Sequence, residues 1–414
     1  MAEVMASKRS AGRVPWLIII CGCLIAAMTF GARSGMGFFQ LPMLAEKGWD
    51  RQTFGMAMAL QNLFWGLSLP FFGAIGDRFG TWRVLAIGGV VYAAGLYVMA
   101  TAASPSMLYL GGGVLVGLGI AAGSFSIVLA AFARHTPPGR RSVVFGIGTA
   151  AGSAGMFLFA PISQGLIDAY GWSDSLVYIG IAMLALPILA IPLAGNARDS
   201  KTAMAEIQQS VGAALREAVG HSSFVLLTSG FFVCGFQIGF ITAHFPAYVR
   251  DIGIAPRYAV IALALIGFCN VIGSLASGMI GQRYSKPIFL VLIYLARSIA
   301  VTAFLLLPQT PVSVIVFAIV MGLLWLSTVP PTNSLVAIMF GTRHLGMLGG
   351  VVFLSHQIGS FLGVWLGGFL YDRFHSYDPV WWLGVALGLL AALVHWPISE
   401  RPVERALPVP AAAE

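Results

Sequence analysis

Residues 16–45 of this sequence are mostly apolar and carry a single charge, that of Arg33 near the middle. Thirty residues of α-helix rise about 45 Å, whereas the hydrocarbon core of a bilayer is about 30 Å thick. An arginine at the centre of such a helix costs at least about 3 kcal/mol to insert. Thr29, Gly37 and Gln40 share its helical face. We therefore expect Arg33 to face a wet cavity or a substrate. The alternative is a structural arginine that binds carbonyl groups inside a helix bundle.

The composition predicts a membrane protein with many crossings. Of 414 residues, 58% are hydrophobic and 9% charged, whereas a soluble chain carries about 25% charged residues. The net charge of +8 is scattered over short loops, which argues against nucleic acid binding. The four cysteines lie in apolar spans without disulfide or metal-ligand spacing, and no nucleotide-binding glycine loop occurs. We expect no enzyme activity, no cofactor and no metal site.

Apolar runs between charged or Pro/Gly-rich breaks divide the chain into twelve predicted spans. We predict a six-helix bundle at 1–195, a cytoplasmic linker at 196–222, a second bundle at 223–399 and a cytoplasmic tail at 400–414. The linker allows a surface helix at about 204–219. The predicted spans are 16–44, 53–75, 82–102, 106–133, 142–168, 173–195, 223–249, 258–281, 287–308, 311–337, 344–371 and 379–398.

The distribution of Lys and Arg predicts the orientation. Of the 23 Lys and Arg residues, sixteen lie in the two termini or in loops on the same side of the membrane as the termini. Five lie in the loops on the other side, and Arg33 and Arg297 are embedded in spans. Positive residues concentrate on the cytoplasmic side of membrane proteins. Both termini are therefore predicted to be cytoplasmic, and the short loops favour a bacterial inner membrane.

The two halves of the sequence repeat each other. The pattern Asp168, Asp174, Gly180 recurs as Asp372, Asp378, Gly384, 204 positions later, and Pro42 recurs as Pro246 at the same offset. Residues 73–80 (GAIGDRFG) recur as 278–285 (GMIGQRYS), 205 positions later. This predicts a duplicated six-helix unit, as in transporters whose substrate site lies between two parallel halves.

The segment 73–80, followed by Arg83, resembles the signature loop of the major facilitator superfamily. The resemblance implies the major facilitator fold over the whole chain: all-α, with twelve transmembrane helices in two six-helix halves. It also implies a cytoplasmic gate in which Asp77, Arg78 and Arg83 latch the halves. Arg283 stands in the second copy, which has Gln282 in place of the acid.

Within that superfamily the first span resembles the monocarboxylate porters and the oxalate–formate exchangers. Phe30-Gly-Ala-Arg33-Ser34 with Phe38-Phe39 is similar to the porter segment in which a basic residue precedes Ser and a Phe pair. The resemblance implies that Arg33 contacts a substrate carboxylate. The porters carry an Asp and an Arg in span eight, where this sequence has Asn270 and Ser274.

The embedded charge is entirely positive, because every acidic residue lies in a loop, a terminus or a span edge. An anionic substrate is the natural counter-ion for Arg33. Arg297 either lines the same path or hydrogen-bonds within the bundle.

By the repeat, Gln237 corresponds to Arg33 and His244 to Gln40. His244 is either a carrier of the coupled proton or a neutral hydrogen-bonded histidine. Other polar residues in the spans are candidate substrate ligands or interhelical contacts: Gln61, Asn62, Asn270, His356 and Gln357.

Together these observations predict a secondary transporter of a small organic anion, a mono- or dicarboxylate, that works by alternating access. Coupling would be symport with a proton or exchange of anions, and the protein is expected to act as a monomer in the bilayer. The alternative is an exporter of drugs or metabolites with the same fold. A membrane sensor without transport activity would be expected to carry a larger soluble domain than the 27-residue linker.

Overall fold

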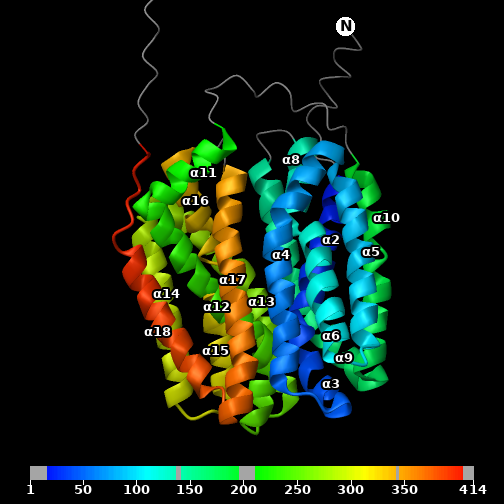
Figure 1. Ribbon diagram of the computed structural model, residues 1–414. Helices are drawn as coiled ribbons and strands as arrows, with labels where there is room; N and C mark the ends of the chain where they lie inside the picture. Colours follow the sequence, from blue (N-terminus) through cyan, green and yellow to red (C-terminus); the bar gives the residue numbers. More distant parts are fainter. Residues whose placement is uncertain (1–15, 137–140, 195–209, 342–344, 404–414) are drawn as a thin grey trace, which may run out of the picture.

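The computed structural model describes residues 16–136, 141–194, 210–341 and 345–403, and Figure 1 shows a bundle of long helices in two halves. The described chain enters and leaves the bundle at the same end, drawn at the top. We call this end the terminal end and the other end the opposite end. No strand occurs in the described ranges.

The N-terminal half contains the elements from α2 to η4, in which short 3₁₀ and π-helical segments extend or interrupt the long helices. The first crossing consists of three consecutive elements, α2, η1 and α3. The elements are α2 (Trp16–Ser34), η1 (Met36–Phe39), α3 (Gln40–Lys47), α4 (Arg51–Phe79), α5 (Thr81–Ala100), α6 (Pro105–Leu108), η2 (Tyr109–Leu115), α7 (Val116–Ala122), α8 (Phe125–His135), α9 (Arg141–Met183), α10 (Leu186–Ala190) and η4 (Ile191–Leu193).

The C-terminal half begins with a short helix, α11, at the terminal end and continues through six crossings, one of which is divided between α15 and α16 (Figure 1). The elements are α11 (Val211–Gly220), α12 (Ser222–Asp251), α13 (Pro256–Arg283), α14 (Lys286–Leu306), α15 (Pro311–Leu324), α16 (Val329–Phe340), α17 (Leu345–Phe374) and α18 (Asp378–His395).

Eleven apolar segments of the described chain are long enough to cross a membrane. The longest, Gly146–Leu193, contains two crossings, because the backbone turns at Gly171, where φ is +80° and the helical dihedrals are broken. The twelve predicted crossings and the all-α fold class are therefore confirmed. Helix α11 falls within the predicted linker helix, whose first residues lie outside the described ranges, and the proposed boundaries of linker and tail remain predictions.

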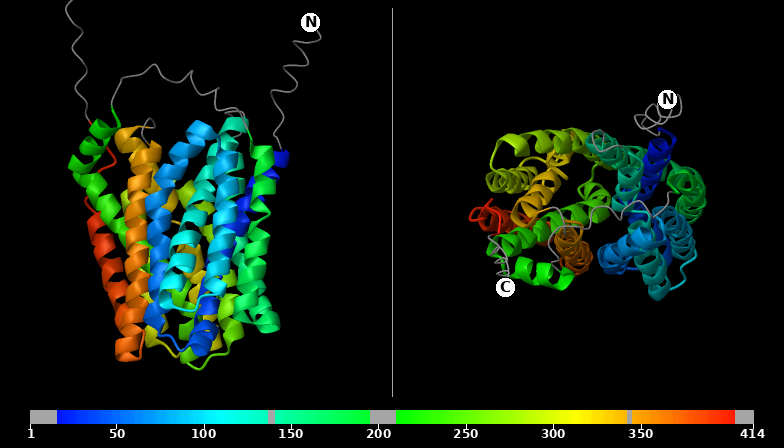
Figure 2. Two further views of the ribbon diagram at one scale, coloured as in Figure 1. Left: turned by 45° about the vertical axis from the view of Figure 1, so that its right-hand side comes forward. Right: turned by 90° about the horizontal axis from the view of Figure 1, so that it is seen from above.

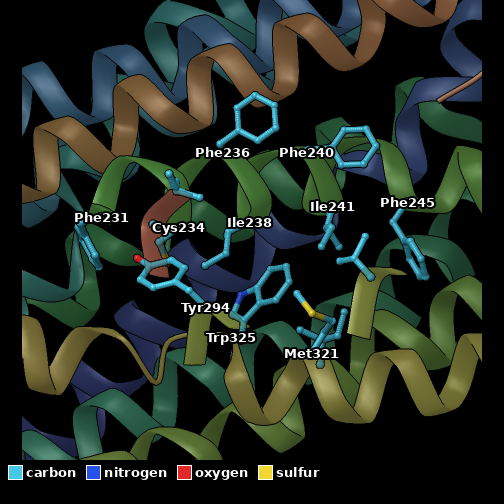
Figure 3. Packing of buried hydrophobic residues seen from close by; sticks show 14 of the residues in the cluster. Phe231, Cys234, Phe236, Ile238, Phe240, Ile241, Phe245, Tyr294, Met321 and Trp325 are labelled. Atoms are coloured by element: carbon cyan, nitrogen blue, oxygen red, sulfur yellow. The ribbon is translucent and has the colours of Figure 1, made fainter. Parts of the chain in front are cut away.

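Each half has its own buried core. The view from above in Figure 2 shows the two groups of helices side by side, and Figure 3 shows aromatic and aliphatic side chains of α12, such as Phe240 and Ile241, packed in the core of the C-terminal half. The halves meet where α4 packs along α17 and α9 packs along α13. A site between these helix pairs belongs to both halves, so a relative movement of the halves changes it.

Glycines in equivalent positions bring equivalent helices into close contact. In the N-terminal half α2 packs on α9, and a Cβ on Gly155 would collide with the carbonyl of Ala27. In the C-terminal half α12 packs on α17, and a Cβ on Gly359 would collide with the carbonyl of Phe232. Gly155 and Gly359 are 204 positions apart. The duplication read from the sequence is thus reproduced in helix packing.

Candidate functional site

A pocket lies between the two halves near the middle of the first crossing. Its walls come from α2, η1 and α4 of one half and from α12 and α17 of the other. Arg33, Gln61 and Asn62 are the predicted site residues that line it. The full lining is Arg33, Met36, Met58, Gln61, Asn62, Gly239, Thr242, Ala243 and Val364.

Arg33 is buried in this pocket, and no described residue serves as its counter-ion. Its side chain is only 6% exposed, and Nη2 donates a hydrogen bond of 2.6 Å to Asn62 Oδ1. The guanidinium carbon lies 4.8 Å from the centre of the Trp65 ring and 6.0 Å from that of Phe30. Its Nε has no partner, and none of the ion pairs among the described residues includes it. A buried guanidinium in this state can still bind an anion.

Trp65 is a member of this site that the sequence did not single out. Its ring contacts the guanidinium of Arg33 and meets the edge of Phe353 from α17 at 5.2 Å between centres. Trp65 therefore joins the arginine to the other half. The sequence does contain one indication of this role: Trp65 follows Gln61 by one helical turn on α4, so the two residues share a helix face.

Amide side chains connect α4 to α17 beside Arg33. Gln357 Nε2 donates to the backbone carbonyl of Asn62 at 3.1 Å, and its Oε1 lies 2.9 Å from Nδ1 of His356. Gln61 instead donates within its own half, to the carbonyl of Gly112 in the π-helical segment η2. Gln357 is therefore an interhalf contact next to the pocket, whereas the amide of Gln61 binds within the N-terminal half.

His244 is fully buried on α12 and contacts the backbone of Val364, which lines the pocket. Its Nε2 lies 2.8 Å from the carbonyl of Val364, so this nitrogen carries the hydrogen and Nδ1 accepts. Nδ1 lies 3.1 Å from Gln40 Nε2 and 3.2 Å from the hydroxyl of Tyr377. These contacts hold a neutral imidazole between the halves. Gln40 and His244 are the pair that the repeat makes equivalent, and they contact each other directly.

The structure does not bring Gln237 to the pocket of Arg33. Its Nε2 donates to the carbonyl of Gly384 at 3.0 Å, so the amide points into the C-terminal half. There it lines a separate small pocket with aromatic residues that include Phe240 and Trp381. The position equivalent to Arg33 has thus become part of the internal packing of its own half.

Asn270 and Arg297 instead stabilise a break in the tenth crossing, between α15 and α16. Asn270 Oδ1 accepts from the backbone of Leu326 at 3.0 Å, and its Nδ2 donates to Ser153 Oγ of α9 at 3.0 Å. Arg297 donates to the carbonyls of Leu324 and Trp325.

Arg297 also donates to Cys234 Sγ at 3.3 Å; Cys234 and Trp325 lie near each other in Figure 3. The donors of this arginine are therefore used inside its own half. Of the two alternatives for Arg297, lining the path or hydrogen bonding within the bundle, these contacts favour the second. Pro330 and Pro331, which lack N–H groups, are the sequence signal for this break.

The predicted gate segment is the end of α4 and not a long loop. The helix continues to Phe79, and Gly80 adopts φ of +94° before α5 begins at Thr81. This backbone favours glycine and explains the last glycine of the signature. In the second copy Ser285 has φ of −58°, so no glycine is required.

The basic residues of the predicted gate are exposed at the terminal end. Arg83 donates to the carbonyl of Phe79 at 2.7 Å, and Arg78 and Arg283 form none of the ion pairs among the described residues. The side chain of Asp77 lies outside the described residues. The gating role of these four residues remains a prediction. In the part of the chain that the structure describes, no three His, Cys, Asp or Glu side chains gather as a metal site.

The fold and the interhalf pocket define a helical membrane transporter built from two repeated halves. A sequence profile described as the Major Facilitator Superfamily matches residues 21–364 and 230–413, and the chain belongs to this family. It is 24% identical to the "Uncharacterized MFS-type transporter YcxA" of Bacillus subtilis, covering 89% of this chain and 91% of that protein. It is also 24% identical to "Monocarboxylate transporter 13" of Bos taurus, covering 94% and 92%.

Solved structures show the same fold. A D-xylose-proton symporter superposes with a TM-score of 0.72 at 15% identity, covering 93% of this chain and 98% of that one. A bacterial homologue of the human lysosomal transporter Spinster, in an inward-facing and occupied conformation, gives 0.72 at 13% identity, with 92% and 96% covered. Its membership of the Major Facilitator Superfamily makes the protein a multi-pass membrane transporter and not an enzyme.

Proposed function

We propose that this protein transports a small organic anion, a mono- or dicarboxylate, by alternating access, as proton symport or anion exchange. The observation that carries the proposal is the state of Arg33: it is buried between the halves, hydrogen-bonded to a neutral amide and without a carboxylate partner among the described residues. A cation in this environment gains most from an anion that can accept two of its N–H groups. The name of the relative from Bos taurus, a monocarboxylate transporter, supports the same substrate class.

The rest of the pocket suits a small, partly apolar molecule. Met36 and Met58 line it from the N-terminal half, and methionine side chains adapt to ligands of different shape. Gly239, Thr242 and Ala243 of α12 line the other side. In our proposal the carboxylate contacts Arg33 and Asn62, and the remainder of the substrate lies between the methionines and α12.

We assign the coupled proton to His244. Its surroundings are Gln40 from α3, the Val364 carbonyl from α17, and Tyr377, whose hydroxyl also accepts from Arg51. A proton on Nδ1 would turn an acceptor into a donor. Gln40 can accept this hydrogen bond if its amide group rotates by half a turn. Its Oε1, which has no hydrogen-bond partner among the described residues, would then face Nδ1 in place of Nε2. Since Val364 also lines the pocket of Arg33, His244 is one residue away from the proposed substrate site.

Ligand-dependent stability of the purified protein tests the substrate class. We would measure thermal unfolding with lactate, succinate, D-xylose and a cationic dye in the wild type, in Arg33→Gln, and in Arg257→Gln, which removes the same charge from an exposed position. A ligand at a hundredfold excess over its dissociation constant stabilises by about 2.7 kcal/mol. We expect stabilisation by a carboxylate in the wild type and in Arg257→Gln, and none in Arg33→Gln. Stabilisation by neutral or cationic compounds alone would favour an exporter and reduce Arg33 to a structural residue.

Transport assays in proteoliposomes distinguish coupling to the proton from binding of the anion. His244→Gln is expected to keep exchange of labelled for unlabelled substrate and to lose accumulation driven by a pH gradient, because no titrating group remains next to Gln40. Accumulation equal to that of the wild type would exclude His244 as the proton carrier and leave Arg33 unaffected. We also propose that the protein lies in the inner membrane with both termini in the cytoplasm, as the Lys and Arg distribution predicts.

A further inference from the structure

At the opposite end an arginine of one half binds an aspartate of the other half. Arg51 is the first residue of α4, and Asp251 is the last residue of α12. Nη2 of Arg51 donates to one carboxylate oxygen at 2.8 Å, and Nη1 donates to the other oxygen. The two side chains are 12% and 26% exposed, so water only partly screens the pair. The contact is the paired, fork-like arrangement that gives arginine–carboxylate interactions their strength.

Two tyrosines hold the guanidinium of Arg51 in place. Its central carbon lies 3.6 Å from the centre of the Tyr371 ring, at the end of α17, and Nη1 donates to the Tyr377 hydroxyl at 2.9 Å. Both tyrosines belong to the C-terminal half. The side chain of Arg51 is therefore fixed by three residues of the other half, a degree of organisation that an ordinary surface ion pair lacks.

A second carboxylate from the C-terminal half binds the start of α4. Asp372, on α17, accepts hydrogen bonds from the backbone N–H groups of Arg51 at 3.2 Å and Gln52 at 2.6 Å. The first N–H groups of a helix have no partner within the helix and carry the positive end of its dipole. Asp372 thus caps a helix of the other half, next to the ion pair.

The repeat provides an internal comparison for Asp372. Its equivalent in the N-terminal half, Asp168, accepts from Gln164 at 2.7 Å, within its own helix α9. At the terminal end, the basic residues of the predicted gate are exposed, and no ion pair joins the halves there within the described ranges. Among the described residues, charged contacts between the halves are thus concentrated at one end of the molecule.

We propose that Arg51, Asp251 and Asp372 form a latch that holds the opposite end closed and opens when the carrier exposes its pocket on that side. The latch involves none of the residues that line the pocket around Arg33. It therefore goes beyond the proposed function and holds for any solute that the protein carries. Breaking the latch shifts the balance between the two access states without replacing any side chain that lines the pocket.

Distances between spin labels at the opposite end test the latch without a substrate. Ala45 and Ala255 are exposed on the two halves and can carry the labels as cysteines. We would record distance distributions by pulsed electron resonance in the wild type, Asp251→Asn, Asp372→Asn and the matched control Asp168→Asn. In Asp251→Asn, which breaks a partly exposed pair, the ratio of the long-distance to the short-distance population is expected to rise about three- to fivefold. A similar rise is expected in Asp372→Asn, which removes a negative charge from the N-terminus of α4, and no change is expected in Asp168→Asn.

A charge exchange separates the latch from a general loss of structure. Arg51→Asp alone is expected to open this end, and Arg51→Asp combined with Asp251→Arg is expected to restore part of the short-distance population. Distributions in Asp251→Asn and Asp372→Asn that match Asp168→Asn would overturn the proposal. The proposal would also fail if the double variant Arg51→Asp with Asp251→Arg had no larger short-distance population than Arg51→Asp alone. Neither outcome depends on whether an anion binds at Arg33.

Discussion

The two embedded arginines are expected to respond in opposite ways to the same substitution. Arg297 donates to the carbonyls of Leu324 and Trp325 at the break between α15 and α16, and it is fully buried. Arg33 makes one hydrogen bond to a neutral side chain and leaves Nε unpaired. Both arginines lie at the depth of the bilayer. Within the described ranges, Arg297 satisfies two backbone carbonyls at the break, whereas Arg33 satisfies none.

The expected changes in the free energy of unfolding follow from the hydrogen bonds and the charge that each substitution removes. Arg297→Met leaves one buried and one partly buried carbonyl without donors, at about 1–3 kcal/mol each. The hydrogen bonds to these carbonyls offset the cost of burying the Arg297 cation, so its removal brings no comparable relief and we expect a net loss of about 2–6 kcal/mol. Arg33→Met loses one charge-assisted hydrogen bond, about 1.5–3 kcal/mol, but relieves the cost of burying an unpaired cation, which is several kcal/mol. We therefore expect Arg33→Met to be neutral or to stabilise the ligand-free protein by about 1–2 kcal/mol.

Unfolding of the purified, ligand-free protein in detergent checks this contrast. Both variants are followed by intrinsic fluorescence during heating and denaturant titration, with size-exclusion profiles taken beforehand. Substrate must be absent, because bound anion stabilises only proteins that retain the site. If Arg33→Met lowered the midpoint as much as Arg297→Met, Arg33 would be a structural residue, and the reasoning from its missing counter-ion would be refuted.

Two further predictions concern packing and the end of the chain. Gly359→Val places a side chain against the Phe232 carbonyl, so we expect α12 and α17 to separate and the thermal midpoint to fall sharply, with a loss of more than about 3 kcal/mol. Burial alone would raise the pKa of Glu400, but hydrogen bonds from Ser285 and Lys286 outweigh burial and lower it. A lowered carboxyl pKa stabilises the fold above the unfolded value, about 4.3, and this contribution is lost as pH falls through the folded pKa. Glu400→Gln should therefore cost about 0.5 kcal/mol at pH 7 and little at pH 3, as measured by unfolding at both pH values.

The crossings were predictable because the bilayer imposes a length on every apolar segment. Span two, predicted over 53–75, agrees with the apolar segment Arg51–Gly76, and its helix α4 continues beyond that segment to Phe79. Span ten was predicted as one segment over 311–337, but it is divided into α15 and α16 next to Pro330 and Pro331, which have no N–H group to donate to the preceding turn.

The site was only partly predictable because a repeat gives equivalent positions and not equivalent side-chain directions. Arg33 and Gln237 are equivalent, yet one faces the pocket and the other turns into its own half. The latch was missed for a different reason. Arg51 and Asp251 were read only as loop charges, and nothing in the sequence indicates that positions 200 apart meet. Their contact depends on how the halves are closed.

The divergence of Arg33 from Gln237 also bears on which anion fits. Among the described residues that line the pocket, Arg33 is the one charged side chain, and its repeat equivalent donates its amide to Gly384. A second carboxylate on the substrate would lie among Met36, Met58 and α12 without a cation, at a desolvation cost of several kcal/mol. We therefore expect a monocarboxylate such as lactate to stabilise the protein at concentrations at least about tenfold lower than a dicarboxylate such as succinate, since tenfold corresponds to about 1.4 kcal/mol. Equal potency, with both effects lost in Arg33→Gln, would mean that a second cation reaches the pocket during the transport cycle.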